Sequence, residues 1–217
     1  MAGASRTPAA GRRYGGRTAE ERHAERREQL VGAGVQLIGT GGFGNTSIRA
    51  VLRESGLAER YFYESFDSLQ SLLVAVHEHV HERVVARVRD ATADPTLDTE
   101  ARARAGLLAF VQTITSDPRW VKIKLAELGS SESEAMATFR RRAHDEYAEL
   151  LVRYGPTAAT SARGLQPHAL ALAVIAGVES LLDSWASGQL RMTLDELIDH
   201  SVVIIKGTSS ELEREIA

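Results

Sequence analysis

Three residues in one short segment have the types and spacing of a zinc-peptidase motif. His77, Glu78 and His81 form an H-E-x-x-H sequence, and on a helix the two histidines lie one turn apart, where they can bind Zn²⁺ beside a carboxylate base. Glu100, nineteen residues after His81, is near the spacing of a third ligand. No strand pattern supplies the sheet edge that would hold a peptide substrate. We therefore favour a second interpretation, a polar helix face that needs no metal; a third, adventitious binding of a metal ion by His77 and His81, stays open.

A second group of residues with evident chemistry is a set of arginines near the N-terminus. Residues 1–66 contain ten arginines and seven acidic residues, whereas residues 67–217 contain sixteen basic and twenty-two acidic residues. Residues 1–19 have no acidic side chain and are rich in Gly and Ala, so they cannot pack a core. This segment is either a solvated tail or a basic arm that lies on a polyanion such as DNA. Its arginines are Arg6, Arg12, Arg13 and Arg17.

The composition of the chain excludes several further classes of protein and of functional site. The 217 residues include no cysteine, which excludes disulfide frameworks, thiolate zinc sites and cysteine nucleophiles. No glycine-rich phosphate loop, dinucleotide fingerprint or catalytic triad order is present, so neither a cofactor nor an enzymatic activity is expected. No apolar run approaches the ~20 residues that span a bilayer, and the first residues lack the apolar segment of an export signal. The sequence predicts a soluble, cytoplasmic protein that does not enter a membrane.

The elements that must position these residues are helices. Stretches of the chain have apolar residues at intervals of three and four, and most helix-breaking Gly and Pro residues fall between these stretches. This pattern predicts an all-α protein of about nine helices. Thr46 is expected to cap the second helix, Asp67 or Ser68 the fourth, and a Thr193–Glu196 capping box the last, which should stop at Gly207. The approximate ranges are 18–41, 46–55, 58–64, 68–90, 100–115, 118–128, 132–154, 167–187 and 193–206.

The first three predicted helices have the spacing of a helix-turn-helix, with Gly56 in the turn. The stretch includes Gly42-Phe43-Gly44-Asn45-Thr46-Ser47-Ile48-Arg49, Val51, Gly56-Leu57, Phe62-Tyr63, Phe66 and Leu72-Leu73. On these residues the segment 24–76 resembles the N-terminal domain of the TetR family of bacterial transcription regulators. The resemblance implies a helix-turn-helix DNA-binding domain over 20–66 after a flexible basic arm over 1–19. It also implies a ligand-binding and dimerisation domain over 67–217.

The resemblance further implies a homodimeric, effector-responsive regulator, most simply a repressor, that binds a palindromic operator in double-stranded DNA. Thr46 and Tyr63 match positions that contact phosphate, and Arg60 is the candidate for a guanine contact. Alternative roles remain open, since Thr46 fits a plain N-cap and Arg60 fits a phosphate contact. The full set of DNA-binding candidates is Thr46, Ser47, Arg49, Ala58, Glu59, Arg60, Tyr61 and Tyr63, with Arg12, Arg13 and Arg17 of the arm.

Four positions depart from the family pattern. Ala58 stands for the usual Ser, Arg60 for Gly, and Ser65 for His or Tyr. Leu69 replaces a Lys that contacts phosphate at the start of the fourth helix. The missing positive charge must therefore come from Arg60, Arg49 or the basic arm, and the sequence does not decide among them.

The C-terminal domain is predicted to bind a small, mainly apolar effector and a second copy of the chain. Aromatic and aliphatic side chains of the middle helices are the candidates for an effector pocket, although the same residues fit an ordinary core. They are Phe110, Ile114, Trp120, Ile123, Met136, Phe139 and Tyr147, with Glu179 as a polar anchor. The last two helices carry more apolar surface than one small domain covers easily, which predicts a homodimer interface. Its candidates are Leu170, Val174, Val178, Leu181, Trp185, Ile198, Val202 and Ile205.

Overall fold

The computed structural model describes residues 18–129, 133–154 and 166–213, and this part of the chain contains helices and no strand. The all-α prediction is confirmed, and the nine α-helices of the described part lie close to their predicted ranges. A short 3₁₀ helix, η1 (Phe43–Asn45), is added between the first two. The α-helices are α1 (Ala19–Gly41), α2 (Ile48–Ser55), α3 (Glu59–Ser65), α4 (Leu69–Thr92), α5 (Thr99–Thr115), α6 (Pro118–Gly129), α7 (Glu134–Tyr154), α8 (Pro167–Ala186) and α9 (Leu194–Glu213).

Side chains that satisfy the first backbone N–H groups explain where several helices begin. At α1, the Thr18 hydroxyl accepts from the Glu21 N–H (3.1 Å), and the Glu21 carboxylate accepts from the Thr18 N–H (2.6 Å). The predicted capping box of α9 has the same reciprocal geometry. Glu196 accepts from the Thr193 N–H at 2.7 Å, and its own N–H donates to the Thr193 hydroxyl at 3.3 Å.

Two predicted helix ends are wrong. Ser47, rather than Thr46, caps α2, and its hydroxyl accepts from the N–H three residues later at 3.2 Å. Thr46 follows η1 directly, and its hydroxyl turns back to donate to the Gly42 carbonyl at 3.0 Å. The last helix continues through Gly207 to Glu213. One glycine costs a helix only about 1 kcal/mol, and no proline follows to end it.

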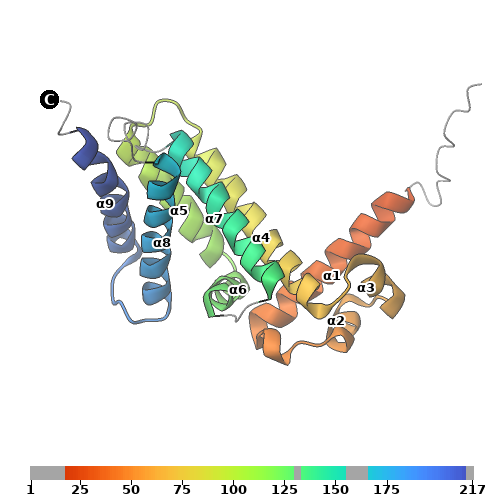
Figure 1. Cartoon of the computed structure of the whole chain (residues 1–217). Coiled ribbons are helices and arrows are strands. Elements are labelled where there is room, and N and C mark those ends of the chain that lie inside the picture. The colour runs from red at the N-terminus through yellow and green to blue at the C-terminus, as the bar shows by residue number, and fades with distance from the viewer. Residues whose placement is uncertain (1–17, 130–132, 155–165, 214–217) are drawn as a thin grey trace, which may run out of the picture.

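The helices place the N-terminal part at one end of the molecule (Figure 1). There α1, α2 and α3 pack together, and α8 and α9 lie at the opposite end, while α4, α5 and α7 run between. The first half of α4 packs on α1, and its remainder packs on α5 and α7. The short helix α6 packs against α1. We call α1–α3 the head and the remaining helices the C-terminal domain.

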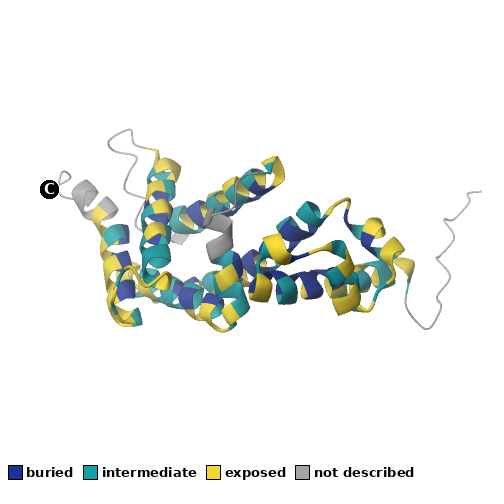
Figure 2. Cartoon of the chain, turned by 90° about the horizontal axis from the view of Figure 1, so that it is seen from below, coloured by how far each residue is buried: buried dark blue, intermediate teal, exposed yellow. Residues whose placement is uncertain are grey.

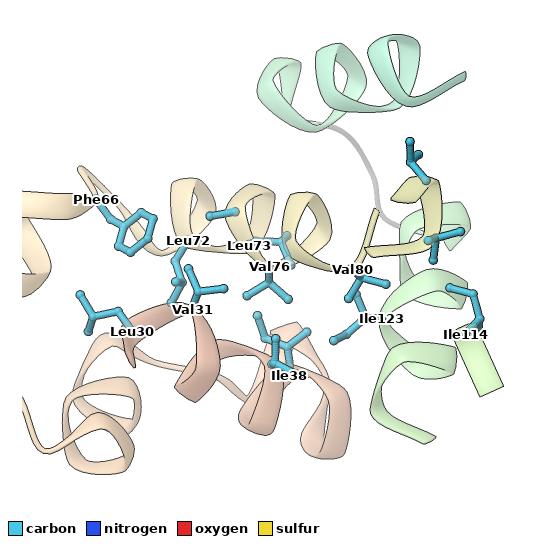
Figure 3. Packing of buried hydrophobic residues seen from close by; sticks show 14 of the residues in the cluster. Leu30, Val31, Ile38, Phe66, Leu72, Leu73, Val76, Val80, Ile114 and Ile123 are labelled. Atoms are coloured by element: carbon cyan, nitrogen blue, oxygen red, sulfur yellow. The ribbon is translucent and has the colours of Figure 1, made fainter. Parts of the chain in front are cut away.

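The core is continuous between the head and α4 (Figure 3). Leu30 and Ile38 of α1 face Leu72 and Val76 of α4, and all four are nearly or wholly buried. Gly34 allows this close approach, because a Cβ at this position would lie 2.7 Å from the Val76 Cγ2 atom. The position of the head on α4 is therefore fixed by tight apolar packing.

Helix α8 is unusually apolar. By length and composition alone it is long enough to span a membrane, with a mean hydropathy of 1.5 over its most apolar stretch. Core helices of soluble proteins meet the same criterion, and α8 packs against α7 and α9. Buried residues line one side of the α8–α9 pair, while much of the other side is half-buried or exposed (Figure 2).

Candidate functional site

The second and third helices meet at a glycine turn. Gly56 has φ 69° and ψ 13°, the left-handed region that only glycine enters without strain. Its N–H donates to the Leu52 carbonyl at 3.0 Å and ends α2. Leu57 and Ala58 then lead directly into α3, which packs against α1. This is the helix-turn-helix arrangement that the sequence predicts, with α3 in the place of the recognition helix.

Helix α3 has one buried face and one exposed face. Phe62 is fully buried and Phe66 is 4% exposed, with 5.8 Å between their ring centroids. Tyr63, the next residue after Phe62, leaves 53% of its surface exposed. The aromatic core thus orients the helix so that its first turn faces solvent. The exposed members of the predicted DNA-binding set are Ser47, Arg49, Ala58, Glu59, Arg60 and Tyr63.

Tyr61 is the half-buried member of that set, and it lies between two arginines. The guanidinium carbons of Arg26 and Arg60 lie 4.4 and 4.5 Å from the centroid of its ring. Arg60 also donates to the Tyr61 hydroxyl at 2.5 Å, and this hydrogen bond and the charges nearby raise the pKa of Arg60. Arg26 forms an ion pair with Glu64 at 3.5 Å. Arg26 was missed from the sequence because its partners are on another helix.

Thr46, a predicted phosphate contact, does not point its hydroxyl to solvent. It is buried, and its hydroxyl is used inside the turn, so the structure does not present it to a ligand. Ser47 stands at the open end of α2 instead. Arg12, Arg13 and Arg17 lie outside the described residues. Of the predicted DNA-binding residues, the described head therefore exposes Ser47 and Arg49 at the start of α2, Ala58, Glu59 and Arg60 at the start of α3, and Tyr63.

A cavity of about 120 Å³ lies among α4, α5, α7, α8 and α9. Its wall is apolar except for a few side chains, which include Arg102 and Glu179. A second cavity of about 60 Å³ shares Phe110, Glu179 and Leu182 with the first. The other residues of the larger cavity are Val88, Thr92, Ala103, Gly106, Leu107, Phe110, Tyr147, Leu150, Leu151, Val174, Ile175, Val178, Leu182 and Ile205.

The predicted effector-binding residues are not all brought together. Phe110, Tyr147 and Glu179 line the larger cavity. Ile114 lines the smaller one and, with Ile123, a third small hollow beside α4. Met136 and Phe139 form a separate cluster with Ala143, and Trp120 packs against the main core. Three of the eight therefore stay candidates for the larger cavity, and a role in effector binding is still a prediction for them.

Glu179 is held by a lysine and a histidine. Its carboxylate lies 3.6 Å from the Lys124 Nζ and 2.9 Å from the His144 Nε2, and only 12% of its side chain is exposed. Burial pushes the pKa of Glu179 upward, but the hydrogen bond with His144 and the charge of Lys124 outweigh it, so the pKa is lowered. Glu179 is therefore an ionised group in an apolar wall.

The histidines of the H-E-x-x-H sequence are buried rather than on a polar helix face. The rings of His77 and His81 pack on Phe139, and the His81 Nε2 is 2.9 Å from the Glu146 carboxylate. Glu78 pairs with Arg142. Burial, followed by the charge of Lys124, lowers the pKa of His77 to about 3.

The third predicted ligand of that motif has a different partner. Glu100 accepts a hydrogen bond from Lys206 of α9 at 2.5 Å. Among the described residues, no group of three or more His, Asp and Glu side chains could hold a metal ion. The two histidines of the motif are buried packing residues of α4, and its glutamate forms an ion pair.

The predicted dimer-interface residues divide into two groups. Leu170, Leu181 and Trp185 are partly exposed on α8. The remainder are buried within the protomer, among α5, α7, α8 and α9, and their prediction as surface contacts is corrected. These residues are Val174, Val178, Ile198, Val202 and Ile205. An apolar stripe does not reveal which helix covers it. The face left exposed includes Ala173, Ala176 and Ser180 of α8 and Val203 of α9, which is 68% exposed.

The contact between α6 and α1 was not predicted. The Arg119 Nη1 donates to the Gln36 side chain at 2.5 Å, and the Lys122 Nζ donates to the Thr40 carbonyl at 3.4 Å. Gly39 lets the two helices touch, because a Cβ there would lie 2.4 Å from the Arg119 Cβ. Lys124, which pairs with Glu179, is on the same helix. The head is thus joined to the cavity wall by α6 as well as by α4.

Comparisons with known proteins agree with this geometry. Residues 30–76 match the family described as bacterial regulatory proteins, tetR family. No curated protein matches the sequence. Many solved structures share the fold; one is a putative transcriptional regulator from Pseudomonas aeruginosa PAO1, with a TM-score of 0.72 and 19% identity over 89% of this chain and 95% of that one.

Two further structures have the same arrangement of helices. The fatty acid degradation regulator FadR from Bacillus halodurans has a TM-score of 0.68 and 16% identity, over 84% of this chain and 95% of its own. A putative TetR-family regulator from Syntrophomonas wolfei has a TM-score of 0.68 and 17% identity, over 86% and 96%. Residues 30–76 therefore belong to a DNA-binding domain of the TetR family of bacterial regulatory proteins, in a chain that has the fold of that family's regulators.

Proposed function

We propose that the chain is a homodimeric repressor that binds a palindromic operator in double-stranded DNA and leaves it when a small, mainly apolar effector enters the C-terminal domain. The observation that carries this proposal is the exposed first turn of α3, which presents Glu59 and Arg60 outward from a helix-turn-helix core. A recognition helix contacts base edges with these N-terminal residues. Such a protein acts in the cytoplasm, where its operator lies.

Phosphate contacts are expected on either side of the first turn of α3. The first N–H groups of α2 attract anions, because a helix N-terminus leaves them without an intrahelical partner. Ser47 stands at that end, and Tyr63 adds an exposed phenol. Arg49 is exposed on α2 and compensates for the apolar Leu69, with further charge from Arg12, Arg13 and Arg17 of the arm.

A second copy of the chain is expected on the exposed face of α8 and α9. Small side chains on α8 allow close approach of another helix, and Val203 of α9 is a large exposed apolar residue. Burying this face in a two-fold symmetric pair removes it from water. A dimer would present two α3 helices, which bind half-sites one turn of DNA, about 34–36 Å, apart or a multiple of that distance.

An effector changes DNA binding only if it binds one conformation of the dimer better than another. Two helices connect the cavity to the head. Val88 of α4 lines the cavity, and Leu72 of the same helix packs on α1. Lys124 of α6 pairs with the cavity residue Glu179, and Arg119 of α6 contacts α1. We infer that the occupied cavity moves these helices and changes the spacing of the two heads.

An electrophoretic mobility shift tests operator binding. The DNA flanking the chain's own gene is compared with random DNA of the same length at physiological salt. We expect at least about a thousandfold tighter binding to a palindromic segment of the flanking DNA, as is usual for specific DNA-binding proteins. Equal binding to both would instead indicate a helical binding protein without an operator.

Sedimentation of two variants tests the dimer. Leu181→Glu and Val203→Glu each place a charge on the exposed face of α8 and α9, and we expect monomers that no longer bind the operator. Arg87→Glu changes an exposed residue of α4 away from this face and should stay dimeric. Intact dimers for both Glu variants would exclude this interface. Ile205→Glu is unsuitable as a test, because Ile205 is buried within the protomer.

A further inference from the structure

The larger cavity of the C-terminal domain is lined by carbon over nearly all of its surface. Much of its wall is aliphatic, as at Leu107 of α5 and at Val174 and Val178 of α8. The rings of Phe110 and Tyr147 also line it, and they contact each other edge to face with 5.8 Å between their centroids. A ligand in this cavity therefore meets apolar side chains and very little polar surface.

Two polar side chains of the wall use their hydrogen-bonding groups elsewhere. The Thr92 hydroxyl donates to the Val88 carbonyl of its own helix at 2.8 Å. The Arg102 Nη2 donates to the Asp94 and Leu97 carbonyls, each at 3.0 Å. The Arg102 Nε has no hydrogen-bond partner among the described residues, but neighbouring atoms shield it fully, so a ligand cannot reach it. Neither residue offers a hydrogen bond to a ligand.

Glu179 does not supply an acceptor to the cavity either. Its carboxylate lies between Lys124 and His144, at 3.6 and 2.9 Å. Its Oε1 atom accepts no hydrogen bond among the described residues, and it is shielded as fully as the Arg102 Nε. An anionic ligand would be repelled by this carboxylate and a cationic one by Lys124, in a wall where water screens charge only weakly. Neither sign of charge is therefore favoured.

The volume of the cavity limits the size of a ligand. The cavity measures about 120 Å³. In another protein, an apolar cavity of about 150 Å³ stays free of water and holds benzene. Water is not favoured here either, because a buried water molecule needs about two to four polar partners. The space therefore suits a molecule the size of one six-membered ring, and it is too small for a long alkyl chain.

We propose that the effector is an uncharged hydrocarbon no larger than a single ring with a small alkyl substituent, and that the cavity selects it by offering no partner to polar groups. This assignment rests on the proposed function for its regulatory meaning, but the binding itself can be measured without DNA. Binding removes the apolar surface of the ligand and of the wall from water. A polar group on the ligand loses its hydrogen bonds to water and gains none, so it weakens binding.

Calorimetric titration of the full-length protein with four one-ring ligands tests this assignment. Toluene and phenol differ only in a methyl group and a hydroxyl of similar size, and benzoate and benzylammonium carry a negative and a positive charge. We expect toluene to bind at least about tenfold more tightly than phenol, and the two ions to bind least, because the wall leaves their polar groups without partners. Phenol or either ion bound as tightly as toluene would overturn the proposal, as would a failure of toluene to bind.

Two alanines of α5 locate the binding site. Ala103 lines the cavity, and Ala103→Leu fills part of it. Toluene affinity should then fall at least about tenfold, because the ligand and the added side chain cannot share one close-packed space. Ala105→Leu is the matched control, since Ala105 is on the same helix but not in the cavity wall, and it should keep the parent affinity. Equal toluene affinity in the two variants would contradict binding in this cavity.

A larger ligand tests the size limit. Naphthalene, which has two fused rings, should bind the parent protein at least about tenfold more weakly than toluene, because a close-packed wall has no space for the second ring. Leu107→Ala shortens a side chain of the wall, and naphthalene should gain affinity relative to toluene in this variant. Naphthalene that binds the parent protein as tightly as toluene would show that the size limit is wrong.

The operator assay separates this proposal from the proposed function. If toluene binds in the cavity and also releases the operator, both are supported. If it binds in the cavity without releasing the operator, the ligand class stands and its role as effector is wrong. If the protein binds no operator but keeps the preference for toluene over phenol, the repressor proposal fails and the ligand class still stands.

Discussion

The interiors of the head and of the C-terminal domain are packed differently. In the head, Leu30, Val51 and Phe62 are fully buried and fill the space between short helices. In the C-terminal domain, apolar side chains surround cavities, and ionisable groups such as His77 and Glu179 lie inside the wall. A close-packed core favours one conformation. A cavity leaves space for a ligand, and buried ionisable groups make the conformation of a domain sensitive to nearby charge. The proposed function needs such a difference, because a head that binds DNA must keep its shape while the other domain admits an effector.

Lowering the pH should destabilise the C-terminal domain more than the head. The pKa of His77 is about 3 in the folded chain and near 6.5 when unfolded, so the unfolded state binds its proton first as the pH falls. The stability that His77 contributes is complete above pH 6.5 and is lost as the pH falls toward 3. Between pH 6.5 and 4.5 the loss is about 2–3 kcal/mol, because each pH unit corresponds to about 1.4 kcal/mol.

Urea unfolding of the parent protein and of His77→Leu measures this contribution. The variant should lose less stability over the same pH range, since it has no proton to bind at this position. His79→Leu is the comparison on the same helix; the pKa of His79 is lowered by burial and by Arg83, but it is less enclosed, so the change should have the same sign and be smaller. Identical pH dependence for the parent protein and His77→Leu would show that His77 is not the acid-sensitive group.

The burial of His77 illustrates what the sequence could and could not predict. Helix positions and the Thr193–Glu196 capping box depend on residues a few places apart, and they were predicted well, apart from the Thr46 cap and the Gly207 stop. The environment of a histidine on α4 depends on α7, sixty residues later, which the H-E-x-x-H spacing does not report. The same reason explains why Arg26 was missed beside Tyr61. It also explains why Val174 and Ile205 were assigned to a dimer interface although other helices of the same protomer cover them.

A substitution at Gly39 should disrupt the contact of α6 with α1, which joins the C-terminal domain to the head. Gly39→Ala places a Cβ 2.4 Å from the Arg119 Cβ and 2.9 Å from its Cα, so the backbone of α6 must move. Overpacking of this kind costs about 1–3 kcal/mol, and we expect operator affinity or effector response to change with it. Gly32→Ala is the matched control on α1, since nothing lies within 4 Å of its added Cβ.

The control should stabilise the chain slightly, because Ala favours a helix over Gly by about 0.5–1 kcal/mol. Thermal unfolding and the mobility shift, measured for both variants, separate the two effects. If Gly39→Ala behaves like Gly32→Ala in both assays, the contact between α6 and α1 is not a rigid connection. All coupling between the head and the C-terminal domain would then run through α4.

The smallest expected effect is a change in how well the head alone discriminates between bases. A bidentate arginine–guanine contact discriminates between bases by about 1–3 kcal/mol. Arg60 is stacked on Tyr61 and hydrogen-bonded to its hydroxyl in the free protein, and leaving an exposed cation–π contact costs about 0.5–1 kcal/mol. The net discrimination that Arg60→Ala removes should therefore be near 1 kcal/mol, at the lower end of that range. Tyr61→Leu frees Arg60 from the stack and should raise discrimination if the stack opposes DNA binding. Affinities for operator and random DNA that fall equally in Arg60→Ala would instead identify Arg60 as a phosphate contact, and the head would then read bases through Glu59 and its neighbours.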